Sequence, residues 1–263
     1  SFVRFALASV MLLAVVYRME RRLPKPRPAD ILPLILMGMT GVFAYNVCFF
    51  KGLQIITAGR AALIVANNPV FIALFNALIF RDRLYPLAGV GILLSLTGAG
   101  IVITRGDMVH ALKGGVGLGE LFMFGCVLSW SAYSLIGKSV LTRLSPLASV
   151  TWASVLGMAA LAPPACMEGL FSAIGTLSAP AWMGILYLGI FGTVAGFVLY
   201  YRGIREIGPA RASQFINLVP VSAILMAALI LDEPLTQSLM VGGILVLTGI
   251  TLTNVASTRA VKR

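Results

Sequence analysis

The most constraining feature of this 263-residue chain is an internal repeat, in which residues 38–98 align without a gap to residues 189–249. About a third of the aligned positions are identical, which apolar composition alone rarely gives. The identical pairs, all 151 positions apart, include Gly38 and Gly189, Gly52 and Gly203, Arg60 and Arg211, Pro69 and Pro220, and Gly98 and Gly249. Two copies of a multi-helix unit in an apolar chain indicate a carrier whose substrate site lies where the copies meet.

Composition excludes several classes of protein. Hydrophobic residues make up 59% of the chain and charged residues 11%, so a soluble domain of this length is excluded. The net charge of +11 does not indicate nucleic-acid binding, because the basic residues lie in short loops between apolar runs and form no continuous face. The three cysteines, Cys48, Cys126 and Cys166, lie in apolar segments without metal-binding spacing, and we expect no metal or cofactor.

Nine apolar segments follow one another along the chain, most of them near the ~20 residues needed to cross a bilayer. Each must be a helix, because an open sheet would leave backbone groups unpaired in lipid. The predicted segments are 2–17, 31–50, 61–80, 85–104, 118–137, 147–166, 181–201, 212–231 and 236–256.

The loops alternate in basic charge, which predicts the orientation in the membrane. Fifteen of the 20 Lys and Arg residues fall on one side, which the positive-inside rule assigns to the cytoplasm together with the C-terminus. The loop Lys51–Arg60 falls on the far side, whereas its counterpart Arg202–Arg211 falls on the cytoplasmic side. The two copies are therefore predicted to have inverted topology, and each must hold an odd number of helices.

This parity predicts the domain organisation. Residues 118–256 form a second repeat of five helices, whereas residues 1–104 supply four and lack the counterpart of the first. Residues 105–117 link the repeats, and residues 257–263 form a basic cytoplasmic tail. The expected fold is an all-α integral membrane protein with two inverted-topology five-helix repeats, ten helices in the complete protein and nine in this chain.

Several short motifs resemble the drug/metabolite transporter superfamily in its ten-helix EamA branch. They are Arg4-Phe5-Ala6-Leu7-Ala8, Gly52-Leu53 before the Pro69 helix, the turns Arg81-Asp82-Arg83 and Asp232-Glu233-Pro234, and the glycine-rich helices that end near Gly98 and Gly249. The first turn departs from the family, which often has Gly-Glu where Asp82 is flanked by arginines. The resemblance implies a carrier of small metabolites in a bacterial inner membrane, among them exporters of amino acids.

A first candidate site surrounds two prolines near the middle of equivalent segments. A proline inside a helix frees a backbone carbonyl and favours a kink, and amides at membrane depth need polar partners. The predicted substrate-binding residues of this group are Asn67, Asn68, Pro69, Gln214, Asn217 and Pro220. The alternative is structural: these amides hydrogen-bond the freed carbonyls or neighbouring helices.

A second candidate site begins on the helix after the linker, where Trp130, Tyr133 and Ser134 lie on adjoining faces. Aromatic and amide side chains of other helices could complete a box for an amphiphilic solute, namely Tyr45, Asn46, Trp152 and Tyr200. The alternative is an interfacial belt of Trp and Tyr near the helix ends.

These observations predict a secondary transporter of small amphiphilic metabolites, most of all an exporter of aromatic or neutral amino acids, working by alternating access at a midplane cavity. The expected partners are this solute and the lipid bilayer, in a monomer or weak homodimer. No acidic residue lies at mid-span, which favours facilitated export or exchange over proton coupling, with Glu120 as the exception to test. A lipid flippase is the alternative. An enzyme is not expected, because the one histidine, His110, lies in a loop without ligand partners.

Overall fold

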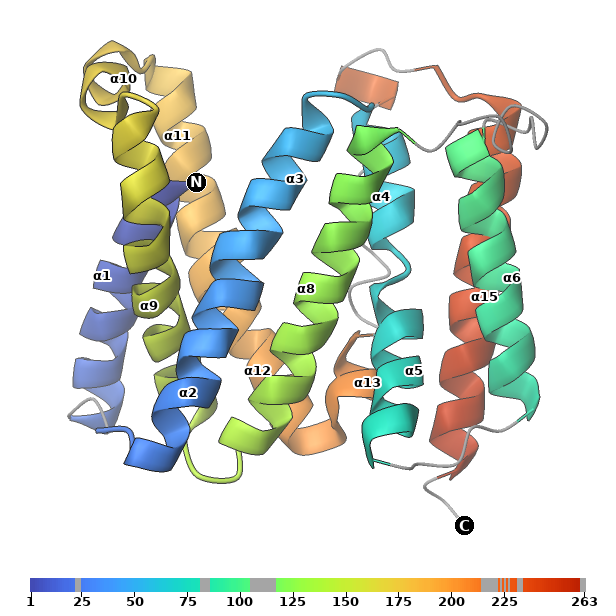
Figure 1. Cartoon of the computed structure of the whole chain (residues 1–263), viewed down its shortest axis with the longest axis horizontal. Coiled ribbons are helices and arrows are strands. Elements are labelled where there is room, and N and C mark those ends of the chain that lie inside the picture. The colour runs from blue at the N-terminus through green and yellow to red at the C-terminus, as the bar shows by residue number, and fades with distance from the viewer. Residues whose placement is uncertain are drawn as a thin grey trace. The chain divides into compact units, whose positions relative to one another are not determined.

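The computed structural model describes residues 1–21, 25–80, 86–104, 117–213, 222, 224, 226, 228–230 and 234–260. Throughout these residues the regular structure is helical (Figure 1). In chain order the elements are α1 (Phe2–Glu20), α2 (Pro28–Met37), η1 (Gly38–Ala44), α3 (Tyr45–Leu53), α4 (Ala58–Val65), α5 (Asn68–Phe80), α6 (Pro86–Thr104), α8 (Leu118–Val140), α9 (Pro146–Met167), α10 (Leu170–Thr176), α11 (Ala179–Tyr187), η2 (Leu188–Ala195), α12 (Gly196–Ile207), α13 (Pro209–Ala212) and α15 (Gln237–Ala260).

Seven helical stretches of the described residues are long and apolar enough to cross a membrane: Phe2–Glu20, Pro28–Leu53, Ala58–Ile79, Pro86–Thr104, Leu118–Val140, Pro146–Met167 and Ala179–Ile207. Each falls on one of the predicted apolar segments. Most of the predicted segment 212–231 and nearly all of the linker lie outside the described residues. The helix starts also follow the sequence offset, because α2 and α11, α4 and α13, and α6 and α15 each begin 151 positions apart.

Two of the long stretches contain a π-helix at equivalent positions. In η1 the cap N–H of Tyr45 donates to the carbonyl of Thr40, five residues back, and the N–H of Gly196 donates to Phe191 in the same way after η2. Glycines let neighbours approach η1 closely: the backbone nitrogen of Gly157 lies 2.8 Å from the position that a Cβ would occupy on Gly38. Wide turns of this kind occur frequently at functional sites.

The segment predicted as one proline-kinked helix is broken into two. Ala66 and Asn67 form a turn between α4 and α5, and Pro69 falls in the first turn of α5. Proline is tolerated there, because the first N–H groups of a helix have no intrahelical acceptor. Because proline has no N–H, its place in the first turn of α5 costs no intrahelical hydrogen bond, and the break replaces the expected kink.

The chain divides into two compact units. Unit 1 comprises Ser1–Asn46 and Ala132–Glu206, and unit 2 comprises Val47–Ser131 and Ile207–Arg263. These units differ from the predicted repeats, since each takes helices from both halves of the sequence. In unit 1, α1 packs on α9, with η1 against α9 and η2 against α1.

Unit 2 is built around the pair α6 and α15, which lie side by side (Figure 1). Their contact depends on glycines, because the carbonyl of Gly249 lies 2.5 Å from the Cβ position of Gly91, and that of Gly242 lies 2.6 Å from the Cβ position of Gly98. The contacts are reciprocal: the carbonyl of Gly91 lies 2.5 Å from the Cβ position of Gly249. Residue numbers rise along one helix as they fall along the other, so the two helices are antiparallel. Such small residues permit close helix packing in lipid.

Candidate functional site

A cluster of aromatic rings lies inside unit 1, where α8 meets α12. The rings of Tyr133 and Tyr201 are 4.9 Å apart, and the Tyr201 hydroxyl donates to the carbonyl of Tyr133 at 2.9 Å. Phe197 lies 5.8 Å from Tyr133 and 6.3 Å from Phe5 of α1. All four side chains are buried. Tyr133, Phe197 and Tyr201 lie six or more residues inside their candidate spans, whereas Phe5 lies in the first turn of α1.

The cluster has a polar edge. The hydroxyls of Ser134 and Tyr200 are 2.8 Å apart, so two predicted site residues from α8 and α12 meet directly. Ser134 is buried and Tyr200 is half-buried. Two other predicted members, Tyr45 and Trp152, belong to the same unit and are half-buried. Trp130 lies one turn before Tyr133 on α8 and is buried.

Asn46 of unit 1 accepts a hydrogen bond from an arginine that the sequence did not single out for the site. Its side-chain carbonyl accepts a hydrogen bond from Nη2 of Arg4 at 2.9 Å, and its amide nitrogen donates to the carbonyl of Val42 at 2.6 Å. The Arg4 guanidinium also lies 4.6 Å above the ring of Phe5. A cationic group, the Arg4 guanidinium held by Asn46, thus lies beside the Phe5 ring of the aromatic cluster.

In unit 2, the amide of Asn67 is committed to the chain itself. Its nitrogen donates to the carbonyls of Leu63 at 3.0 Å and Ile64 at 3.2 Å, and its oxygen accepts from Ser95 at 2.8 Å. These bonds match the structural alternative for the group, in which amides satisfy carbonyls at a helix break. Neighbouring Asn68 is buried, and its Oδ1 has no hydrogen-bond partner among the described residues. Three further predicted members lie outside the described residues: Gln214, Asn217 and Pro220.

A buried ion pair and a pocket lie at one end of unit 2. Arg60 pairs with Glu120 at 2.9 Å, and its guanidinium also donates to the carbonyls of Val102 and Ile103. Next to Arg60 is a pocket of about 560 Å³, lined in part by Thr57 of the α4 start and by residues 234 and 236–239 before and in α15. Glu120, the acid singled out for proton coupling, is therefore held by a guanidinium at a helix end.

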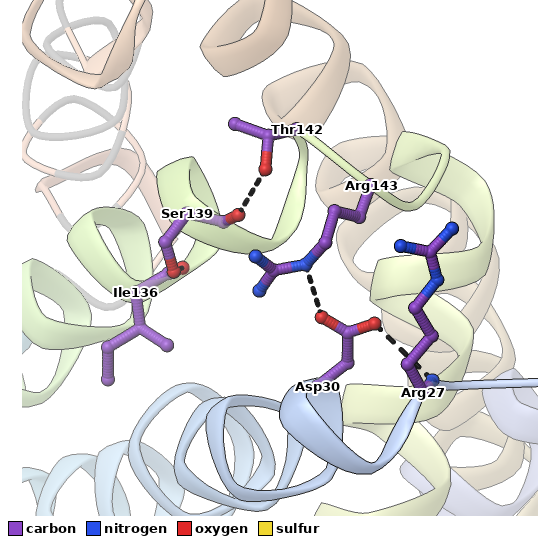
Figure 2. Close-up of polar contacts among 6 residues, drawn as sticks. All are labelled: Arg27, Asp30, Ile136, Ser139, Thr142 and Arg143. Atoms are coloured by element: carbon purple, nitrogen blue, oxygen red, sulfur yellow. Dashed lines mark hydrogen bonds and ion pairs between the residues drawn. The ribbon is translucent and has the colours of Figure 1, made fainter.

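A second ion pair, between buried Asp30 and exposed Arg143, lies in unit 1 (Figure 2). The carboxylate of Asp30 accepts from Nε of Arg143 at 2.5 Å and from the backbone N–H of Arg27 at 3.3 Å, and its side chain is 1% exposed. Asp30 caps the start of α2, and Arg143 follows the end of α8. Near that end the Ser139 hydroxyl donates to the carbonyl of Ile136, and the Thr142 hydroxyl donates to the carbonyl of Ser139. The pair joins the α8–α9 turn to α2.

Comparison with protein families shows to which class of membrane protein the chain belongs. The profile of the EamA-like transporter family matches residues 1–104 and 117–255, nearly the whole chain. The chain belongs to the EamA-like transporter family. It is accordingly a secondary transporter and an integral membrane protein rather than an enzyme, as the sequence motifs predicted.

Relatives of this EamA-like transporter are themselves transporters. The uncharacterized transporter YyaM of Bacillus subtilis is 26% identical, over 94% of this chain and 81% of that protein. An uncharacterized transporter of Archaeoglobus fulgidus is 29% identical, over 94% of this chain and 84% of that protein. A probable terminal-alkyne amino-acid exporter of Streptantibioticus cattleyicolor is 28% identical, over 97% of this chain and 82% of that protein.

The fold of this EamA-like transporter also occurs among solved structures. One crystal structure superposes with a TM-score of 0.67 at 20% identity, over 96% of this chain and 86% of that chain. At that identity the likeness concerns the fold alone.

The structure gathers some of the predicted site residues of this EamA-like transporter and not others. Within unit 1, the ring of Tyr133 contacts that of Tyr201, Ser134 meets Tyr200, and Asn46 meets Arg4. Sequence reasoning did not single out Arg4 for the site, although a charged residue inside an apolar segment is a signal that could have drawn attention to it.

Proposed function

We propose that this EamA-like transporter exports small amphiphilic metabolites, aromatic or neutral amino acids above all, by alternating access at a midplane cavity lined by both repeats. The observation that carries the proposal is the buried aromatic cluster of unit 1 with its polar edge at Ser134 and Tyr200. Apolar walls with a few placed polar groups are typical of sites for such solutes. The amino-acid exporter among the relatives supports the same class of solute.

The inverted topology of the repeats belongs to this proposal. Its support is the reciprocal glycine contact of α6 and α15, in which Gly91 meets Gly249 and Gly98 meets Gly242. Gly242 is the repeat counterpart of Gly91, and Gly249 is that of Gly98. Gly91 therefore packs on the counterpart of Gly98, and Gly98 packs on the counterpart of Gly91. Reciprocal contacts of this kind arise about a two-fold axis, and antiparallel counterparts require that axis to lie in the membrane plane. The basic loops support a cytoplasmic C-terminus by the positive-inside rule, and we infer a bacterial inner membrane.

The mechanism favoured is facilitated export or exchange without proton coupling. Among the described residues the acids Glu20, Asp30 and Glu120 lie near the ends of candidate spans. Each of the three also has a polar partner: Ser145, Arg143 and Arg60. A proton-coupled carrier needs a titratable group that is free to change its charge on the transport path.

Counterflow in proteoliposomes of the full-length protein tests the proposal. Labelled aromatic and neutral amino acids should exchange saturably, and Tyr200→Phe should raise KM about fivefold, because it removes one hydrogen-bonding group from the site. Ser139→Ala is the matched control, since its exposed hydroxyl on α8 bonds only the nearby Ile136 carbonyl at 2.7 Å. Absence of flux for every soluble solute, with lipid movement between leaflets, would instead support a lipid flippase.

A further inference from the structure

Arg4 is a cation inside the candidate span Phe2–Glu20 that has no counter-ion among the described residues. Its Nη2 donates to the carbonyl of Asn46 at 2.9 Å, and its Nε is buried without a hydrogen-bond partner in the described part of the chain. The guanidinium groups of Arg60 and Arg143 each contact a buried carboxylate, that of Glu120 and that of Asp30. The Arg4 side chain is half-buried, and a guanidinium partly removed from water without a negative partner is costly, so this position favours an anion.

The partners of Arg4 lie well inside the helices that carry them. Asn46 precedes the end of its candidate span at Leu53 by seven residues, or about 10 Å at the helical rise. The chain of Arg4 packs against Gly189, whose Cβ position would lie 3.7 Å from the Arg4 carbonyl oxygen. Gly189 is ten residues, about 15 Å, beyond the start of its span at Ala179. Arg4 is the third residue of its own candidate span, but the residues that it contacts lie about 10–15 Å inside theirs.

Both π-helices converge on this arginine. Asn46 lies two residues beyond the end of η1, and Gly189 belongs to η2. The amide nitrogen of Asn46 is committed to the Val42 carbonyl within η1, and this bond directs its oxygen to Arg4. A wide helical turn thus orients Asn46, whose side chain accepts the hydrogen bond from Arg4.

Apolar rings adjoin the cation. The Arg4 guanidinium lies 4.6 Å above the ring of Phe5, which meets Phe197 edge-on at 6.3 Å. Phe197 in turn contacts Tyr133 at 5.8 Å between ring centroids. A solute with a carboxylate and an apolar body would match the cation and the rings at the same time.

We propose that Arg4 binds the carboxylate of the transported solute, with Asn46 holding the guanidinium in place and Phe5 and Phe197 beside the apolar body. The proposal rests on the transport function proposed above, and it narrows the solutes to those that carry an anionic group. A guanidinium can donate two parallel hydrogen bonds to a carboxylate, which a lysine cannot match in geometry.

Three compounds that share a phenyl ring separate the carboxylate from the rest of the solute: L-phenylalanine, phenylacetate and phenethylamine. Thermal-shift titrations of the full-length protein in one detergent measure their binding. L-Phenylalanine and phenylacetate should raise Tm, whereas phenethylamine should not. Arg4→Gln should weaken binding of the two carboxylates by about tenfold or more, which corresponds to loss of one charged hydrogen bond, and Arg4→Lys should restore part of it. Arg18→Gln is the control, because Arg18 is exposed on the same helix.

Asn46→Asp tests the same idea in a protein that should remain well folded. The new carboxylate would pair with Arg4 internally, so the ligand-free Tm should not fall while binding of phenylacetate and L-phenylalanine is lost. Wild-type affinity for both carboxylates in Arg4→Gln and Asn46→Asp would overturn the proposal. It would also be overturned by phenethylamine binding as tightly as phenylacetate, or by none of the three compounds binding.

Counterflow in the same preparations keeps this proposal separate from the transport function. Amino-acid flux that persists with unchanged KM in Arg4→Gln would reject the role of Arg4 and retain the transporter proposal. Absence of flux in the wild-type protein would reject the amino-acid transport proposal itself.

Discussion

At the scale of single residues, charge is placed in two different ways. Asp30 and Glu120 are buried near the ends of candidate spans, and each pairs with an arginine, Arg143 of the α8–α9 turn and Arg60 of α4. Arg4 differs, because its described polar partner is the neutral amide of Asn46. A paired charge fixes the structure, whereas a charge without a counter-ion is available to a ligand.

Replacement of Asp30 by Asn should lower stability by about 1–3 kcal/mol, because the buried carboxylate loses its charged bond to Arg143. The measurement is the thermal or denaturant midpoint of the full-length protein in one detergent. Glu206→Gln on the exposed face of α12 is the control and should leave the midpoint nearly unchanged. Equal midpoints for Asp30→Asn and the wild type would mean that the pair contributes nothing to the fold.

At the scale of helices, two kinds of local geometry recur at equivalent positions of the repeats. The π-helices η1 and η2 form wide turns next to Asn46 and at Gly189, the two residues that contact Arg4. The glycines of α6 and α15 do the opposite and bring two backbones into contact. Wide turns thus accompany the candidate site, and close glycine packing builds the scaffold.

Gly91→Ala should destabilise the protein by about 1–3 kcal/mol, because the new methyl group would collide with backbone atoms of α15 that have little freedom to move. The carbonyl oxygen of Gly249 lies only 2.5 Å from that position. Gly100→Ala on the same helix is the matched control, since no atom lies within 4 Å of its Cβ position. It should be neutral or stabilise by up to about 1 kcal/mol through helix propensity. Unfolding midpoints of the two variants should therefore move apart, and a common shift would contradict the packing argument.

At the scale of the whole molecule, the compact units and the sequence repeats divide the chain differently. Unit 1 combines α1, α2 and η1 with α9, α11, η2 and α12, and unit 2 combines α4 to α6 with α13 and α15. The long helix α8 runs from unit 2 into unit 1 at Ser131 and Ala132. Packing of counterpart helices on each other inside one unit requires both halves of the sequence to be present before either unit is complete.

The proposed inverted topology predicts that equivalent loop positions face opposite sides of the membrane. Lys51 and Arg202 are both exposed and 151 positions apart, so each can carry a single cysteine in a background without Cys48, Cys126 and Cys166. An impermeant thiol reagent applied to intact cells should label position 51, whereas position 202 should react only after the cytoplasmic face is opened. Labelling of both positions from the same side would contradict the inverted arrangement.

The sequence predicted several residues that make contacts inside unit 1, and their role in binding a solute stays a prediction. Tyr133, Ser134, Tyr200 and Asn46 were identified because polar and aromatic side chains in apolar helices need a reason to be there. Asn67 was identified by the same rule, yet its described bonds go to Leu63, Ile64 and Ser95. The sequence cannot distinguish the two outcomes, because it does not show whether a freed carbonyl or a solute lies within reach of an amide.

The sequence by itself determined the helical membrane fold, the family and the positions of most spans, because segment length, helix breakers and a constant offset are signals carried along the chain. The break before Pro69 and the meeting of Arg4 with Asn46, 42 positions away, were decided only by the tertiary structure. The same holds for Asp30 and Arg143, which are 113 positions apart. The physical reason is that the rotation of each helix about its axis, and hence which faces meet, is set by packing between helices.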